Sequence, residues 1–127
     1  MQEKHLYEYA VMRVLPAVER EEFLNVGIIL FSKNAKFIKV LYYLNEAKLL
    51  SFSSKVDIAQ VEMNLKSFEK IANGEARCGP IALLDIPSRF RWLTAVRSSV
   101  IQTSRPHPGL SEDLEQTANR LFEELVM

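Results

Sequence analysis

The sequence predicts an α+β protein in which an antiparallel sheet carries helices packed on one face. Three observations favour this class. The first third of the chain has three runs rich in β-branched and aromatic residues, which is typical of strands. Short turns join these runs, so we expect a three-strand antiparallel meander. Apolar residues then recur at helical spacing in the middle and at the end of the chain. Strands followed by helices indicate an α+β arrangement rather than alternating βαβ units.

Length and composition bound the architecture and the setting of the protein. The chain has 127 residues, of which 48% are hydrophobic, enough for one core and too few for two ordinary domains. We therefore expect a single domain over 1–127. Lys+Arg and Asp+Glu both total 16, so no overall charge attracts nucleic acid or a membrane surface. With one cysteine, Cys78, and no leader or long apolar run, the sequence predicts a cytoplasmic protein and no membrane partner.

The three strands are expected at 6–15, 22–32 and 36–44. Alternation gives each strand one nearly pure apolar face, which we expect the helices to cover. That face carries Ala10, Met12, Val14, Leu24, Val26, Ile28, Leu30, Ile38, Val40, Tyr42 and Leu44. The opposite face mixes aromatic, aliphatic and polar residues. It is too apolar for bare solvent and too polar for an ordinary core.

The helices follow from capping residues and from apolar spacing. Asn45 precedes good helix formers and predicts a short helix over 45–50. Ser54 and Asp57 resemble a capping box for a helix that Gly74 ends. Its apolar stripe is Ile58, Val61, Leu65, Phe68 and Ala72. The remaining expected elements are a short helix from Ser88 to Leu93, a short fourth strand at 99–103, and a last helix capped by Ser111 with the stripe Leu114, Ala118, Leu121, Phe122 and Leu125.

The segment from Ile86 to Ser111 contains four arginines and no acidic residue. Guanidinium and hydroxyl groups together bind phosphate or carboxylate well. This pattern predicts an anion-binding or partner-binding site made of Arg97, Ser98, Ser104, Arg105 and His107. The alternative is that the arginines form internal ion pairs, and that RPHPG is a stiff extended loop.

The mixed face of the sheet is the second candidate surface. Exposed patches that combine aromatic and aliphatic side chains usually mark an interface, so we expect another protein or a second copy of the chain to cover it. The residues predicted for this interface are Tyr7, Tyr9, Arg13, Asn25, Gly27 and Phe31. The alternative reading is structural: Gly27 relieves crowding or marks a bulge, and Asn25 satisfies a neighbouring backbone group.

No pattern in the sequence defines catalytic chemistry. Glu19, Glu21 and Glu22 lack histidine or aspartate at ligand spacing, so no metal site is expected. No glycine-rich phosphate loop is present, and we expect no cofactor. Cys78 and His107 form no recognisable nucleophile–base pair, so no catalytic residue is assigned. Trp92 and Phe90 are interpreted as core anchors.

Three stretches of the sequence carry a family resemblance. YEYAVMRVLPAVEREEFLNVGIILFS near the start, with RFRWLTAVRSSVIQTSRPHPGL and LFEELV near the end, resembles the bacterial family catalogued as domain of unknown function 3037. The similarity spans essentially the whole chain. The family has no established activity, cofactor or catalytic residue to carry over. The resemblance implies a functional pairing with a HipA-like kinase.

Three functions are compatible with these patterns. The first is a non-catalytic accessory module that binds a protein, either a HipA-like kinase or a second copy of the chain. The second is a sensor or enzyme for a phosphorylated small molecule or another anion, which would use the arginine segment. The third is a nucleic-acid binder with Tyr7, Tyr9, Arg13 and Lys39 on the sheet, although the neutral net charge disfavours it.

Overall fold

The computed structural model describes residues 3–16, 22–95 and 100–127, and its centre is an antiparallel sheet of five strands. Their order is β3-β2-β1-β4, with β5 also paired to β1. The strands are β1 (His5–Val14), β2 (Leu24–Ser32), β3 (Phe37–Tyr42), β4 (Ile101–Thr103) and β5 (His107–Ser111). The predicted meander and the fourth strand are confirmed. The α+β class is confirmed as well.

The fifth strand was not predicted, and its first residues belong to the RPHPG segment for which a stiff extended loop was the alternative reading. β5 pairs with β1 from His5 to Tyr9, while β4 pairs with β1 from Met12 to Val14. Both short strands therefore share the edge of β1 that faces away from β2. Proline has no backbone N–H, but an edge strand has one side without ladder bonds and tolerates Pro108 there.

A bulge in β2 changes which side chains face which layer. Met12 lies opposite Gly27 and Arg13 lies opposite Asn25, so Val26 is an extra residue on β2. One extra residue reverses the alternation of side chains beyond it. Ile28 and Leu30 were predicted to share a face with Leu24 and Val26. The structure places them on the other face, and it places Ile29 and Phe31 with the first set.

Gly27 is required by the close approach of β3. A Cβ atom at this position would lie 2.5 Å from the carbonyl oxygen of Leu41 and 2.9 Å from Cβ of Tyr42. The neighbouring backbone, rather than a ligand, occupies the space beside Gly27. The structural reading of this glycine is therefore the correct one.

Gly27→Ala is expected to lower the free energy of unfolding by about 1–3 kcal/mol, because the added methyl group forces β2 and β3 apart. Urea denaturation followed by circular dichroism measures the change. A midpoint equal to that of the unchanged protein would show that the strands separate at no cost, and would contradict the packing described here.

Each helix begins at a side chain that accepts a backbone N–H. The helices are α1 (Glu46–Phe52), α2 (Ile58–Ala72), α3 (Ile86–Leu93) and α4 (Leu114–Leu125), with two 3₁₀ turns, η2 (Ala76–Cys78) and η3 (Pro80–Leu83), before α3. Asn45 caps α1, as predicted. The other three N-caps are Asp57, Asp85 and Asp113 rather than the predicted serines. Ser88 donates two hydrogen bonds to the Asp85 carboxyl, one from its hydroxyl and one from its backbone N–H. Together these bonds hold the pKa of the Asp85 carboxyl below its usual range, and the hydroxyl bond has the larger effect.

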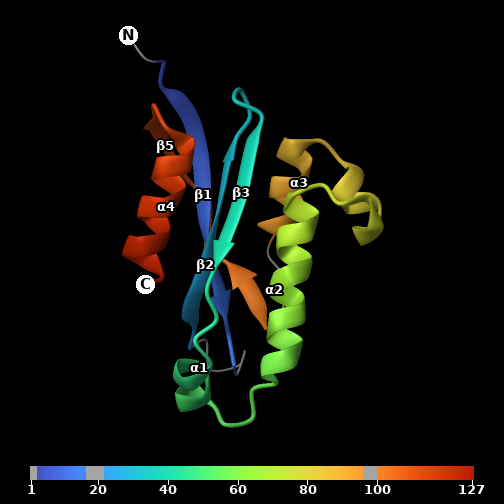
Figure 1. Cartoon of the computed structure of the whole chain (residues 1–127), viewed down its shortest axis with the longest axis vertical. Coiled ribbons are helices and arrows are strands. Elements are labelled where there is room, and N and C mark those ends of the chain that lie inside the picture. Colours follow the sequence, from blue (N-terminus) through green and yellow to red (C-terminus); the bar gives the residue numbers. More distant parts are fainter. Residues whose placement is uncertain (1–2, 17–21, 96–99) are drawn as a thin grey trace.

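Helices lie on both faces of the sheet, which corrects the expectation of one covered face (Figure 1). The first apolar cluster joins α1, α2 and α3 to one face, through Leu49, Val61, Leu65, Phe68, Ala72, Phe90 and Leu93. The second cluster joins α4 to the other face, through Tyr7, Ile28, Leu30, Leu114, Ala118 and Leu121. The sheet is therefore the middle of three layers. Apolar residues occur on both faces of the sheet because each face packs against helices, with the larger apolar cluster on the side of α1, α2 and α3.

Candidate functional site

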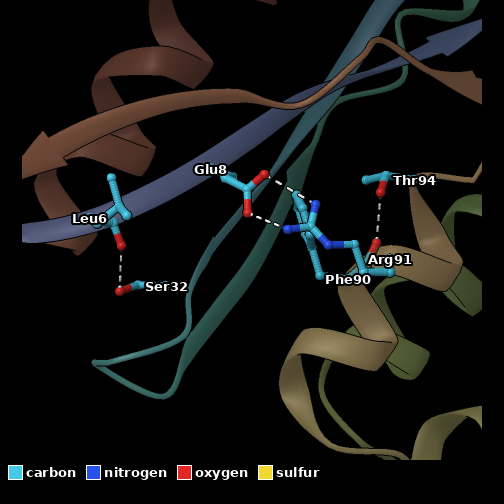
Figure 2. A network of polar contacts seen from close by, with 6 residues as sticks. All are labelled: Leu6, Glu8, Ser32, Phe90, Arg91 and Thr94. Atoms are coloured by element: carbon cyan, nitrogen blue, oxygen red, sulfur yellow. Dashed lines mark hydrogen bonds and ion pairs between the residues drawn. The ribbon is translucent and has the colours of Figure 1, made fainter.

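Two arginines of the acid-free segment hold parts of the fold together. Arg89 donates from Nη1 to the carbonyl oxygen of Ala72 at 3.0 Å, at the C-terminal end of α2. Arg91 makes a two-point contact with Glu8, at 3.1 Å and 2.6 Å, and joins α3 to β1 (Figure 2). For these two residues the structural alternative is correct. They were not among the residues predicted for the anion site.

The residues that were predicted for the anion site do not assemble in the described parts of the chain. The hydroxyl of Ser104 is buried and accepts the N–H of Val11 at 2.9 Å, where it bridges the break between β4 and β5. His107 lies against the ring of Tyr9, with 5.3 Å between ring centroids. Arg105 is exposed beside it. Arg97 and Ser98 lie outside the described residues.

The residues predicted for a sheet-face interface separate into three environments. Tyr7 is buried against α4 in the second cluster. Phe31 lies on the opposite face, stacked on Phe90 at 4.7 Å, because the bulge reverses the alternation. Gly27 faces the backbone of β3. Much of this face is thus covered by α4 of the same chain. The apolar residues there need neither another protein nor a second copy to bury them, and an interface at the remaining residues stays a prediction.

Tyr9, Arg13 and Asn25 remain on the α4 face of the sheet. Asn25 donates from Nδ2 to the carbonyl oxygen of Leu125 at 3.1 Å, near the end of α4. This hydrogen bond agrees with the alternative interpretation, in which Asn25 satisfies a backbone group. Arg13 lies over the ring of Phe23, with 4.2 Å from Cζ to the ring centroid. These three residues share the α4 face with Tyr7, whose ring centroid lies 6.4 Å from that of Tyr9.

The structure adds a cleft that the sequence did not indicate, between α2, α3 and β4. We call it the Trp92 cleft. Its volume is about 280 Å³, and it is lined by Asn64, Ser67, Phe68, Ile71, Trp92, Leu93, Ala95, Ile101, Gln102 and Thr103. Trp92 was interpreted as a core anchor, but it is 38% exposed, whereas Phe90, two residues earlier, is fully buried. Residues two positions apart on an α-helix point about 200° apart, so the two rings cannot both face the core.

The lining of the Trp92 cleft contains no charged side chain among the described residues. Phe68, Ile71 and Leu93 form an apolar floor, and four neutral polar side chains contribute to the walls: Asn64, Ser67, Gln102 and Thr103. Such a cleft suits an apolar group flanked by hydrogen-bonding groups, because a charge placed there would lose water without gaining a partner. A signal was present in the sequence. Gln60, Asn64 and Ser67 form an uncharged line at helical spacing beside the apolar stripe of α2.

Across 3–16, 22–95 and 100–127, no group of three or more His, Cys, Asp or Glu side chains is placed to hold a metal ion. Within those ranges no helix has the length and apolar character needed to cross a membrane. Cys78 is partly buried at the end of η2.

Fold and cleft together define a small α+β protein with a three-layer arrangement and an uncharged, tryptophan-walled cleft. A family model described as "Protein of unknown function (DUF3037)" matches residues 9–126, so the chain belongs to this family. The resemblance seen in the sequence is thereby confirmed. No curated protein and no solved structure matches the chain.

Proposed function

We propose that this protein is a cytoplasmic accessory module that binds another protein through the Trp92 cleft. The observation that carries the proposal is the position of Trp92, a large aromatic side chain partly exposed at the wall of an apolar-floored cleft. Tryptophan is enriched among residues that dominate binding energy, because its ring buries much area with little loss of conformational freedom.

The chemistry of the cleft specifies the partner's contribution. Its apolar floor accepts one aliphatic or aromatic side chain, and the neutral amides and hydroxyls of Asn64, Ser67 and Gln102 match the N–H and C=O groups of a peptide backbone. An uncharged apolar anchor is favoured over a charged one, because the described lining offers no opposite charge. The HipA-like kinase implied by the family resemblance is the first partner to test.

Trp92→Ala is expected to weaken binding of the partner by about tenfold to a hundredfold or more, as removal of a tryptophan at the centre of an interface does. Isothermal titration calorimetry measures the affinity of the purified HipA-like kinase for the unchanged protein and for the Trp92→Ala variant. Trp92 is the single tryptophan of the sequence. Its fluorescence in a complex with a tryptophan-free kinase variant therefore reports on the cleft, and a shift to shorter wavelength is expected.

Leu110→Ala is the matched control, because Leu110 is also an exposed apolar residue but lies on β5. It should bind as the unchanged protein does. Equal affinities for the unchanged protein and the Trp92→Ala variant, with an unshifted fluorescence spectrum in the complex, would exclude the cleft as the binding surface.

A further inference from the structure

Arg13 is a cation whose Nε–H group has no acceptor among the described residues. It projects from β1 on the α4 side of the sheet and is only partly exposed. Its Nε atom is buried and makes no hydrogen bond with any described residue. The contact recorded for its guanidinium is the ring of Phe23, which accepts no in-plane hydrogen bond from the N–H groups. A partly buried guanidinium normally has an acceptor, because removing it from water is costly.

Asn25 lies directly across from Arg13 on β2. Whereas Arg13 has an N–H without an acceptor, Asn25 has an oxygen without a donor. Its Nδ2 group is engaged by the carbonyl oxygen of Leu125, which fixes the orientation of the amide. Its Oδ1 atom is buried and has no donor among the described residues. Directly opposed residues of an antiparallel pair hold their side chains about 5 Å apart. The pair therefore presents one unused donor and one unused acceptor side by side.

A cavity that opens onto solvent lies beside Asn25 and includes a lysine side chain in its lining. Asn25 lines a cavity of about 290 Å³ at the end of the sheet, together with Phe23, Leu24, Lys48, Leu125, Val126 and Met127. Lys48 is the one charged side chain among these described lining residues. Phe23 is 44% exposed, so its ring can turn aside without disturbing the core. A ligand in this cavity lies beside Asn25, and the ring of Phe23, which also lines the cavity, separates it from the guanidinium of Arg13.

We propose that Arg13 and Asn25 form a binding site for a carboxylate that carries an N–H group on the neighbouring carbon. The carboxylate accepts from the Arg13 guanidinium, whose planar fork matches its two oxygens. The adjacent N–H donates to Oδ1 of Asn25. This chemistry occurs in N-acyl amino acids and at the C-terminus of a polypeptide. The site lies on the opposite face of the sheet from the Trp92 cleft and does not depend on the function proposed for that cleft.

N-acetylalanine is the probe that tests the site. In ¹⁵N-labelled protein, the Nε–H signal of Arg13 and the side-chain amide signal of Asn25 should shift saturably as the probe is added. Arg13→Lys keeps the charge but loses the planar fork, so we expect it to bind at least about tenfold more weakly. A short peptide with a free C-terminus and the same peptide with an amidated C-terminus distinguish the two sources: tighter binding of the free peptide than of N-acetylalanine points to a protein C-terminus.

Two ligand controls isolate the two contacts. The methyl ester of N-acetylalanine lacks the charge, and acetate lacks the N–H group, so both should bind more weakly than the probe. The proposal is overturned if the ester binds as well as the acid, if neither side-chain signal shifts, or if a folded Arg13→Lys variant binds as the unchanged protein does. If that variant does not fold, the proposal is tested by comparing how tightly the unchanged protein binds N-acetylalanine and its methyl ester.

Two of the chain's own acids are tested as occupants of the site in the same experiment. Glu19 and Glu21 lie outside the described residues and follow β1 closely in the sequence. A Glu19→Gln, Glu21→Gln double variant should bind the probe as the unchanged protein does. Probe binding that appears only in this double variant would show that the site is filled from within the chain, and would overturn the proposal.

Discussion

Phe90→Ala is expected to lower the free energy of unfolding by about 3–5 kcal/mol, a large part of the stability of a small domain. Phe90 is fully buried and stacks on Phe31 at 4.7 Å, so it connects α3 to the sheet. Its removal leaves a cavity between these layers and weakens the support beneath Arg91, which lies over both rings. Chemical denaturation followed by circular dichroism measures the change.

Phe90→Leu is the matched control for this position. Leucine keeps most of the buried apolar area and leaves a smaller cavity, so its cost should be clearly less than that of alanine. If alanine and leucine destabilise equally, the ring is not packed as described, and α3 contacts the sheet in another way.

The sequence predicted the elements of the fold better than their arrangement. Apolar spacing located α2 and α4, and β-branched runs located the first three strands, because these signals depend on local geometry alone. The stripe Leu114, Ala118, Leu121 and Leu125 shows that α4 has one buried face, yet a stripe does not say which surface it meets. The mixed face of the sheet was the available surface, but it was assigned to a second protein.

The faces of β2 were mispredicted for a reason that a local pattern cannot reveal. Strict alternation assumes one residue per step, and the extra residue beside Gly27 breaks that assumption. A glycine inside an apolar strand is compatible with a bulge, with tight packing or with a ligand approach, and the choice depends on where β3 lies. Here the carbonyl oxygen of Leu41 decides it.

The candidate sites were harder to predict because they depend on which side chains are already used. Ser104 and Arg91 have the chemistry of an anion site, but the first bridges two edge strands and the second pairs with Glu8. Arg13 was predicted as part of a broad interface and emerges as a cation whose Nε–H has no acceptor among the described residues. Trp92 was placed in the core because its exposure depends on how α3 is rotated against the sheet.

Leu121→Ala is expected to lower the free energy of unfolding by about 2–5 kcal/mol, because Leu121 is 5% exposed and lies in the second cluster between α4 and the sheet. Loss of this contact loosens α4 and uncovers apolar residues of the central strands, including Ile28 and Leu30. Uncovered apolar surface promotes association, so the variant should also form larger species on heating. Denaturation curves and light scattering measure the two effects.

Asn119→Ala is the control for Leu121→Ala, because Asn119 is an exposed residue of the same helix and alanine is the better helix former. Its stability should equal or slightly exceed that of the unchanged protein. If Leu121→Ala is no less stable than Asn119→Ala, α4 does not cover the sheet in solution. The mixed face would then be free for a second copy or another protein, as the sequence alone had suggested, and a concentration-dependent mass in light scattering would identify the second copy as its cover.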